Sequence, residues 1–120
     1  MFKTTLYVQV RPDRFIVRKV GDTQTIDRMA PQPFSHPRTL LANFNNAEFF
    51  LKPLVAEVKG RFLLKPHMLI HPLERIEGGL TQIEERAFQE LAIGAGAAKV
   101  KVWSGAPLSD AEVVEKLKGG

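Results

Sequence analysis

The stretch from Lys65 to Trp103, KPHMLIHPLERIEGGLTQIEERAFQELAIGAGAAKVKVW, contains the pattern that decides the fold. Near its start, His67–His71 is a short apolar run between Pro66 and Pro72, and its length and flanking prolines predict a buried strand. Further on, Thr81-Gln82-Ile83-Glu84 is a capping box, in which the threonine hydroxyl and the glutamate carboxylate each accept a hydrogen bond from a free backbone N–H. A helix is therefore predicted to begin here.

After the capping box, the sequence has first the period of a helix and then that of a strand. Apolar residues at helical spacing form one predicted face of the helix: Ile83, Ala87, Phe88, Leu91 and Ala92. Gly94 and Gly96 are expected to end the helix, and Val100 and Val102 alternate with lysines as a second strand. Strand, helix and strand in this order predict a right-handed βαβ unit. The unit contains no catalytic signature.

The first 30 residues predict a three-stranded meander. Alternating apolar residues indicate strands over residues 4–10 and 15–20, and a more polar strand over residues 23–29. Arg11-Pro12-Asp13-Arg14 is typical of a tight turn, because proline presets φ and aspartate suits the next position. Gly21-Asp22 is a second turn signal.

Two more helices are predicted outside these segments. After the proline-rich crossing at residues 30–37, a helix is expected from Asn45-Asn46, with Asn46 as its N-cap, a kink at Pro53 and an end at Gly60. Its apolar stripe consists of Phe50, Leu51, Leu54, Val55 and Val58. A capping box at residues 109–112 predicts a last helix from Asp110 to Lys118.

The resulting order is β-β-β-α-β-α-β-α, an α/β fold. A meander followed by two parallel crossovers predicts the ribonuclease H-like fold of the actin-like ATPase domains, as a single domain over residues 1–120. The expected sheet is mixed and five-stranded, with strand order 3-2-1-4-5 and helices on both faces. Trp103 follows the last strand and is expected in the core, or else as an interface anchor.

Composition indicates an ordinary globular protein with uneven charge. The 120 residues are 44% hydrophobic and include no cysteine, which excludes disulfides and thiolate metal sites. No apolar run approaches the roughly 20 residues of a membrane span, and the N-terminus lacks the features of a signal peptide, so a cytoplasmic protein is expected. Residues 1–65 contain 11 Lys and Arg against 5 Asp and Glu, whereas residues 66–120 contain 6 against 8.

Three segments resemble the bacterial actin-like rod shape-determining (MreB) family. Residues 35–44 are similar to the entry into that family's first-domain helix, and residues 65–72 to one of its strands. The most specific likeness is Leu80–Ala87 followed by Ala95–Val100, which resembles a helix and strand of the family. The resemblance covers about residues 36–103. It implies an actin-like domain associated with cell-shape or filament machinery.

The chain departs from that family at the nucleotide site. The family holds phosphate with an Asp-x-Gly-Thr loop in its first hairpin, whereas this chain has Arg11-Pro12-Asp13-Arg14, without glycine and with a proline that lacks an N–H. The second phosphate loop belongs to a second domain, which 120 residues are not expected to hold. ATP hydrolysis and a bound nucleotide or other cofactor are therefore not expected. The resemblance then implies a binding or scaffold module.

Metal-dependent chemistry finds no support in the sequence. His67 and His71 share a face of the predicted strand, but the usual rise separates them by over about 13 Å, too far to chelate one ion. A ribonuclease H-like nuclease needs an acidic residue in its first strand, and Leu6–Val10 contains none. Neither an enzyme nor a metal site is predicted, and His71 with Glu74 or Glu77 stays open as an alternative pair of metal ligands. Both histidines are expected to flank a strand end at the surface.

The loop at residues 72–80 is the segment most suited to an interaction. It follows the carboxyl end of a parallel strand, where α/β folds receive ligands. The residues in and beside it that are candidates for contact with a partner are His71, Glu74, Arg75, Glu77 and Thr81. Glu84 and Glu85 already complement the positive helix terminus that follows, which weakens an anion site there.

Two function classes remain open. The first is a non-enzymatic protein-interaction or scaffold module that self-associates or binds a partner through an exposed strand, either residues 23–29 or Lys99–Trp103. The alternative is a nucleic-acid-binding module with a basic surface on the meander, formed by Arg11, Arg14, Arg18, Lys19 and Arg28. The lack of a basic run favours the first. Magnesium-dependent turnover would instead indicate a nuclease or ATPase.

Overall fold

The computed structural model describes residues 4–60, 65–76 and 78–119, which form one mixed sheet and three helices. The elements in chain order are β1 (Thr5–Arg11), β2 (Arg14–Lys19), β3 (Thr25–Met29), α1 (Phe44–Lys59), β4 (His67–Pro72), α2 (Gln82–Gly94), β5 (Lys99–Val102) and α3 (Asp110–Gly119). The predicted α/β class and the predicted order of elements are confirmed.

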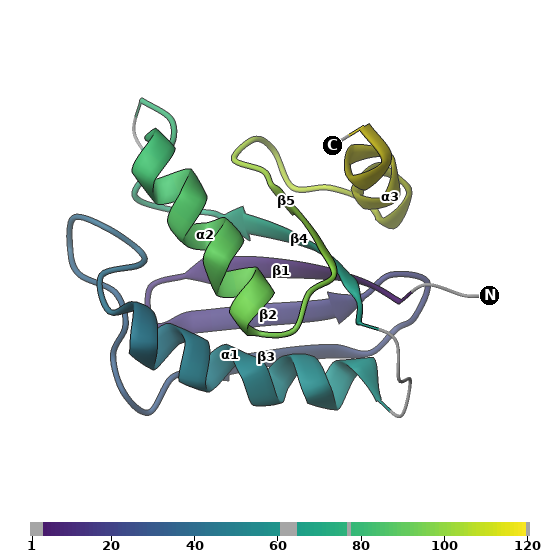
Figure 1. Ribbon diagram of the computed structural model, residues 1–120, viewed down its shortest axis with the longest axis horizontal. Coiled ribbons are helices and arrows are strands. Elements are labelled where there is room, and N and C mark those ends of the chain that lie inside the picture. The colour runs from purple at the N-terminus through teal and green to yellow at the C-terminus, as the bar shows by residue number, and fades with distance from the viewer. Residues whose placement is uncertain (1–3, 61–64, 77, 120) are drawn as a thin grey trace.

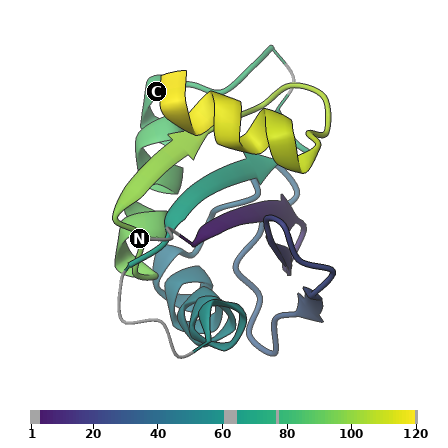
Figure 2. The same cartoon turned by 90° about the vertical axis from the view of Figure 1, so that its right-hand side faces the viewer.

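The sheet has the order β3-β2-β1-β4-β5. β1 and β2 are antiparallel, as are β2 and β3, whereas β4 is parallel to both β1 and β5. Helices α1 and α2 lie on one side of the sheet and α3 on the other (Figure 1, Figure 2). The predicted strand order, mixed pairing and two-sided helix cover are therefore confirmed.

The side-chain period of the strands divides the apolar residues between two faces. On the α1 and α2 side, the larger core cluster includes Leu6, Val8, Val10, Phe15 and Ile70, all with no exposed surface. Fully burying an aliphatic or aromatic side chain contributes about 1.5–3 kcal/mol. This face therefore provides most of the fold's stability.

A smaller cluster on the other face holds α3 against the sheet. Its buried members are Tyr7, Leu69, Leu108, Val113 and Leu117. α3 packs against β4 and β5, and its first residue, Asp110, also reaches β2 through an ion pair with Arg18 at 2.8 Å. Trp103 is half-buried beside the cluster, and its indole N–H donates to the Ala106 carbonyl at 2.8 Å.

The start of α1 differs from the prediction. Asn43, rather than Asn46, is the N-cap, and its Oδ1 accepts from the N–H of Asn46 at 3.0 Å. The Asn46 side chain instead donates to the Pro33 carbonyl at 2.9 Å, which ties the helix to the crossing before it. The helix continues through Pro53, as predicted, and ends at Lys59.

Ile83 was assigned to the buried face of α2, and this prediction is wrong. Its side chain is 83% exposed, whereas Phe88, Leu91 and Ala92 are buried. At about 100° per residue, Ile83 lies roughly 140° around the helix axis from Phe88. It lies one turn before Ala87, and its side chain does not reach the face that meets the sheet.

Local hydrogen bonds explain where the predicted boundaries hold or shift. The capping boxes at Thr81 and Ser109 form as predicted, with Thr81 Oγ1 accepting from the N–H of Glu84 at 3.1 Å and Ser109 Oγ accepting from that of Glu112 at 3.3 Å. β3 begins at Thr25 rather than at residue 23, because the Asp22 carboxylate accepts from Gln24 N–H at 3.1 Å and extends the turn.

Candidate functional site

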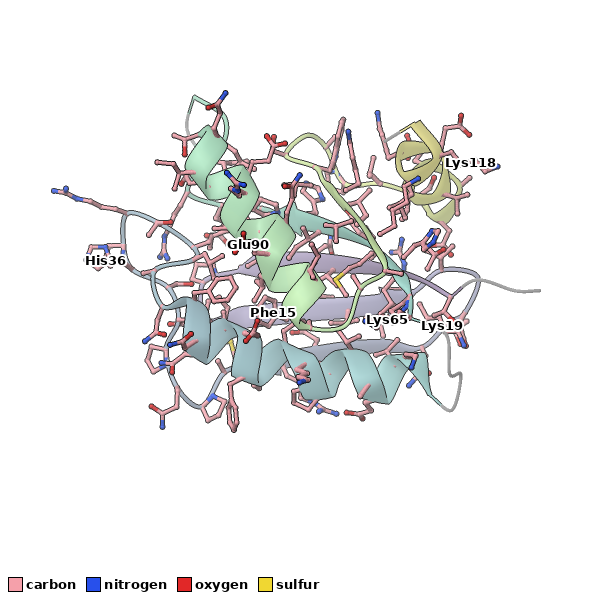
Figure 3. The ribbon with its side chains drawn as sticks, viewed as in Figure 1. Phe15, Lys19, His36, Lys65, Glu90 and Lys118 are labelled. Carbon is pink, nitrogen blue, oxygen red and sulfur yellow. The ribbon has the colours of Figure 1, made fainter. Side chains whose placement is uncertain are left out.

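The carboxyl ends of β1 and β4 lie at the end of the sheet where ligand sites are expected. From β1 the chain proceeds to β2 on one side, and β4 lies on the other side of β1, so the strand order reverses between them. Such a switch point opens a crevice beyond the carboxyl ends of the strands. His36 lies at this end of the sheet and Lys19 at the opposite end (Figure 3).

An open hollow of about 410 Å³ lies at this end of the sheet. It is lined by the first residues after β4, namely Leu73, Glu74, Arg75 and Ile76. Arg11, the last residue of β1, donates from Nη1 to Oε2 of Glu74 at 2.9 Å. Arg75 donates from Nη1 to the carbonyl of His36 at 2.9 Å. These two hydrogen bonds therefore tie the loop that lines the hollow to the end of β1 and to the crossing before α1.

Of the predicted loop residues, Glu74 and Arg75 are the ones that the structure brings to the hollow. Thr81 caps α2 with its hydroxyl. Glu77 lies outside the described residues. His71 does not belong to the loop surface at all, because its side chain has no exposed area.

His71 forms a buried hydrogen-bond network instead of the predicted surface position. Its Nδ1 lies 2.7 Å from the hydroxyl of Tyr7, and its Nε2 lies 2.8 Å from the carbonyl of Gly105. The N–H of Leu108 donates to the same hydroxyl at 3.1 Å. A carbonyl only accepts, so Nε2 carries the proton and the Tyr7 hydroxyl donates to Nδ1.

This network holds the segment before α3 on the sheet. Tyr7 and His71 come from adjacent parallel strands, and both are buried. Burial lowers the pKa of His71 below its ordinary value of 6.5, against the opposing effect of the hydrogen bond to Gly105. A neutral imidazole fits the proton arrangement around it. The role of the pair is therefore structural.

Asp13 organises the crossing before α1, which the sequence did not indicate. Its Oδ1 accepts from the N–H of Phe34 at 2.8 Å and from that of Ser35 at 2.7 Å, and its own N–H donates to Ser35 Oγ at 3.0 Å. The residue has a φ of 54°, as the turn after Pro12 requires. The carboxylate in the first hairpin is thus occupied by the protein's own backbone.

The predicted basic surface is arranged as ion pairs. Four of its members face carboxylates: Arg11 with Glu74, Arg14 with Asp27, Arg18 with Asp110 and Arg28 with Glu57. The fifth, Lys19, ends β2. The hydrogen bonds from Arg14 lower the pKa of Asp27 below its ordinary value. Paired guanidiniums do not form the uniform positive field that favours nucleic acid.

The two edge strands of the sheet differ in how much of them is covered. β5 contacts both α2 and α3, and it carries Lys99 and Lys101, which discourage pairing with another strand. β3 packs against α1 on one side only, and all of its residues except Ile26 are exposed. β3 is therefore the open edge.

The backbone groups of β3 that face outward follow from its ladder with β2. The N–H of Ala30 donates to the carbonyl of Asp13 at 2.7 Å, so these two residues form a hydrogen-bonded pair at the end of the ladder. Hydrogen-bonded and non-hydrogen-bonded pairs alternate in antiparallel strands. The backbone N–H and C=O groups that point away from β2 are therefore those of Thr25, Asp27 and Met29.

Within residues 4–60, 65–76 and 78–119, no three His, Asp or Glu side chains lie close enough together to hold a metal ion. None of the helices in this part of the chain combines the length and apolar character needed to span a bilayer.

Comparison with known proteins shows that the chain is similar in sequence to a protein of Escherichia coli. No protein-family model matches the chain. The chain is 35% identical over 126 residues to a protein of Escherichia coli K12 that is described as uncharacterized protein YjaA. The match covers 96% of this chain and 98% of that protein.

Proposed function

The chain belongs to the same family as Escherichia coli YjaA, and we propose that it is a non-enzymatic protein-interaction module that pairs through edge strand β3. The observation that carries this proposal is the outward row of backbone groups on Thr25, Asp27 and Met29. An added strand can accept and donate hydrogen bonds along such an edge, while alternate side chains provide selectivity. Met29, 63% exposed, supplies an apolar contact beside it.

The proposal includes the finer fold and the setting predicted from the sequence. A meander followed by two parallel connections, in the order β3-β2-β1-β4-β5, supports a ribonuclease H-like, actin-like domain. The use of the Asp13 carboxylate by the backbone of Phe34 and Ser35 supports a domain without nucleotide chemistry. We propose that it acts in the cytoplasm, as a scaffold in cell-shape or filament machinery.

Proline substitution at an outward residue tests the edge directly. Met29→Pro removes an outward N–H and leaves the ladder with β2 intact, whereas Met29→Leu keeps the N–H and the apolar side chain. With a photo-crosslinking residue at Thr25, we expect the Met29→Leu protein to form a discrete adduct in cells and the Met29→Pro protein to lose most of it. Electrophoresis and mass spectrometry measure the yield and show whether the partner is a second copy or another protein.

A control crosslinker at Lys99 on β5 separates edge pairing from random collision. Lys99 is exposed and lies at the opposite edge of the sheet. The proposal fails if the adduct persists in Met29→Pro, or if the Lys99 position gives the same adduct in equal yield. It also fails if neither Thr25 nor the light-scattering mass at high concentration reveals any association.

A further inference from the structure

The open hollow beyond the carboxyl ends of β1 and β4 has the position of a small-molecule site. It lies at the switch point between β1 and β4, and its volume of about 410 Å³ is within the range of ligand pockets. It is separate from the β3 edge, because β2 and β1 lie between β3 and β4. What it binds therefore does not depend on the proposed function.

Among the residues that the structure describes, the charged groups in and beside the hollow have an excess of positive charge. Arg75 lines the hollow and Arg11 is paired with Glu74, so two guanidiniums stand against the single described carboxylate of Glu74. Arg11 and Glu74 are 41% and 43% exposed, so their ion pair is weak and open to exchange with a dissolved anion. A carboxylate on an accessible guanidinium marks the position that the oxyanion of a ligand would take.

Arg75 has a backbone conformation that its side chain type rarely adopts. Its φ is 57°, in the left-handed region that disfavours long side chains, although glycines follow shortly afterwards in the same loop. The bond from Nη1 to the carbonyl of His36 holds the side chain in place. A guanidinium has five N–H donors in a fixed fork, so one bond leaves others for a ligand. Strain of this kind is concentrated at ligand sites.

From these observations we propose that the hollow binds the oxyanion of a small metabolite, a phosphate ester or a carboxylate, between Arg11 and Arg75. Glu74 occupies the anion position on Arg11 when the site is free and is displaced when the ligand binds. Arg75, positioned by the His36 carbonyl, supplies the second guanidinium.

Titration with inorganic phosphate and with succinate, at constant ionic strength set with sodium chloride, tests the site. Proton–nitrogen NMR spectra of the intact chain follow the amides of residues 73–76 and the side chain of Arg11. We expect saturable shifts at these positions with at least one of the two anions, and the anion that gives them identifies the ligand class. Shifts that sodium chloride alone reproduces would overturn the proposal.

Charge variants distinguish a built site from general attraction. Glu74→Gln should tighten binding about two- to fivefold, the range set by the strength of an exposed ion pair. Arg11→Gln should weaken it at least about tenfold, because a charge-assisted contact is lost. The matched control is Glu57→Gln, which makes the same change in net charge beside Arg28 and should leave binding unchanged.

The outcome of the Glu74 variant is decisive even if Arg11→Gln impairs folding. Weaker or unchanged binding in Glu74→Gln would show that the carboxylate does not compete with the anion. An equal increase in affinity in Glu57→Gln would show that the effect comes from the net charge of the protein and not from the hollow. Either result contradicts the proposed site, whereas the proposed pairing through β3 would stand.

Discussion

Lowering the pH from about 7.5 to about 5 should destabilise the protein, and His71→Gln should remove most of this response. The buried imidazole accepts from the Tyr7 hydroxyl at Nδ1 and donates from Nε2 to the Gly105 carbonyl. Burial disfavours a charged imidazolium, and a second proton on Nδ1 would leave the Tyr7 O–H without the acceptor to which it donates. The folded protein therefore disfavours the protonated form, as the lowered pKa of His71 indicates.

The direction of the pH effect follows from that lowered pKa. Well above the ordinary value of 6.5, neither the folded nor the unfolded chain protonates His71. Below this value the unfolded chain binds a proton that the folded protein excludes, so the free energy of unfolding falls, by up to about 1.4 kcal/mol per pH unit. The fall stops once the pH passes the lower pKa of the folded state.

Urea denaturation at a series of pH values measures the effect. His71→Gln should be less stable than the wild type at neutral pH, by about 1–3 kcal/mol, since the amide does not reproduce the positions of both ring nitrogens and one of the two buried hydrogen bonds is lost. Its stability should then vary little between about pH 6.5 and 5. Hydrogen bonds from Arg14 and from Ser109 lower the pKa values of Asp27 and Glu112. The stability that these two carboxylates contribute is therefore lost only at lower pH.

A control at a second histidine identifies the source of the response. His36→Gln changes an exposed histidine and should keep the wild-type dependence on pH. If His71→Gln kept the same slope as the wild type, the buried imidazole would not be the group that titrates, and the structural role assigned to the Tyr7–His71 pair would be wrong.

Asp13→Ala should destabilise the protein by about 2–4 kcal/mol, because hydrogen bonds to a charged acceptor contribute about 1.5–3 kcal/mol. The substitution leaves the N–H groups of Phe34 and Ser35 without their acceptor. It also places alanine at a φ of 54°, which aspartate tolerates better. Asp13→Asn keeps one oxygen and the backbone preference and should lose roughly half as much.

The measurement is again urea denaturation, combined with hydrogen exchange at Phe34 and Ser35. Exchange at these two amides should increase in Asp13→Ala. The matched control is Asp22→Ala, at a turn aspartate whose carboxylate accepts from Gln24 N–H at the exposed end of the hairpin. It should cost less than about 1 kcal/mol. Equal losses in both variants would show that Asp13 does not anchor the crossing.

The errors in the sequence-based predictions arose where a residue has two plausible environments. Ile83 fits the helical period in sequence and yet faces solvent, because it lies roughly 140° around the helix axis from Phe88, which is buried against the sheet. His71 lies beside a proline at the end of an apolar run, a context that suits a surface residue equally well. Only the packing of α3 over β4 shows that it is enclosed.

Half of the candidate site was visible in the sequence. Glu74 and Arg75 were found because the loop after a parallel strand is the usual place for ligands. Arg11 was assigned instead to a basic surface, and its bond with Glu74 depends on β1 and β4 being neighbours. Asp13 and His36 were not singled out, because their partners lie 22 and 39 residues away in the chain.

The sequence by itself determined the type and order of the elements, the capping of α2 and α3, and the strand order of the sheet. Periodicity, turns and caps depend on residues a few positions apart, so a single sequence contains them. The tertiary structure decided which charges pair, that His71 is buried against Tyr7, and that Asp13 holds the crossing before α1. These contacts join segments far apart in the chain, and they form only when packing brings those segments together.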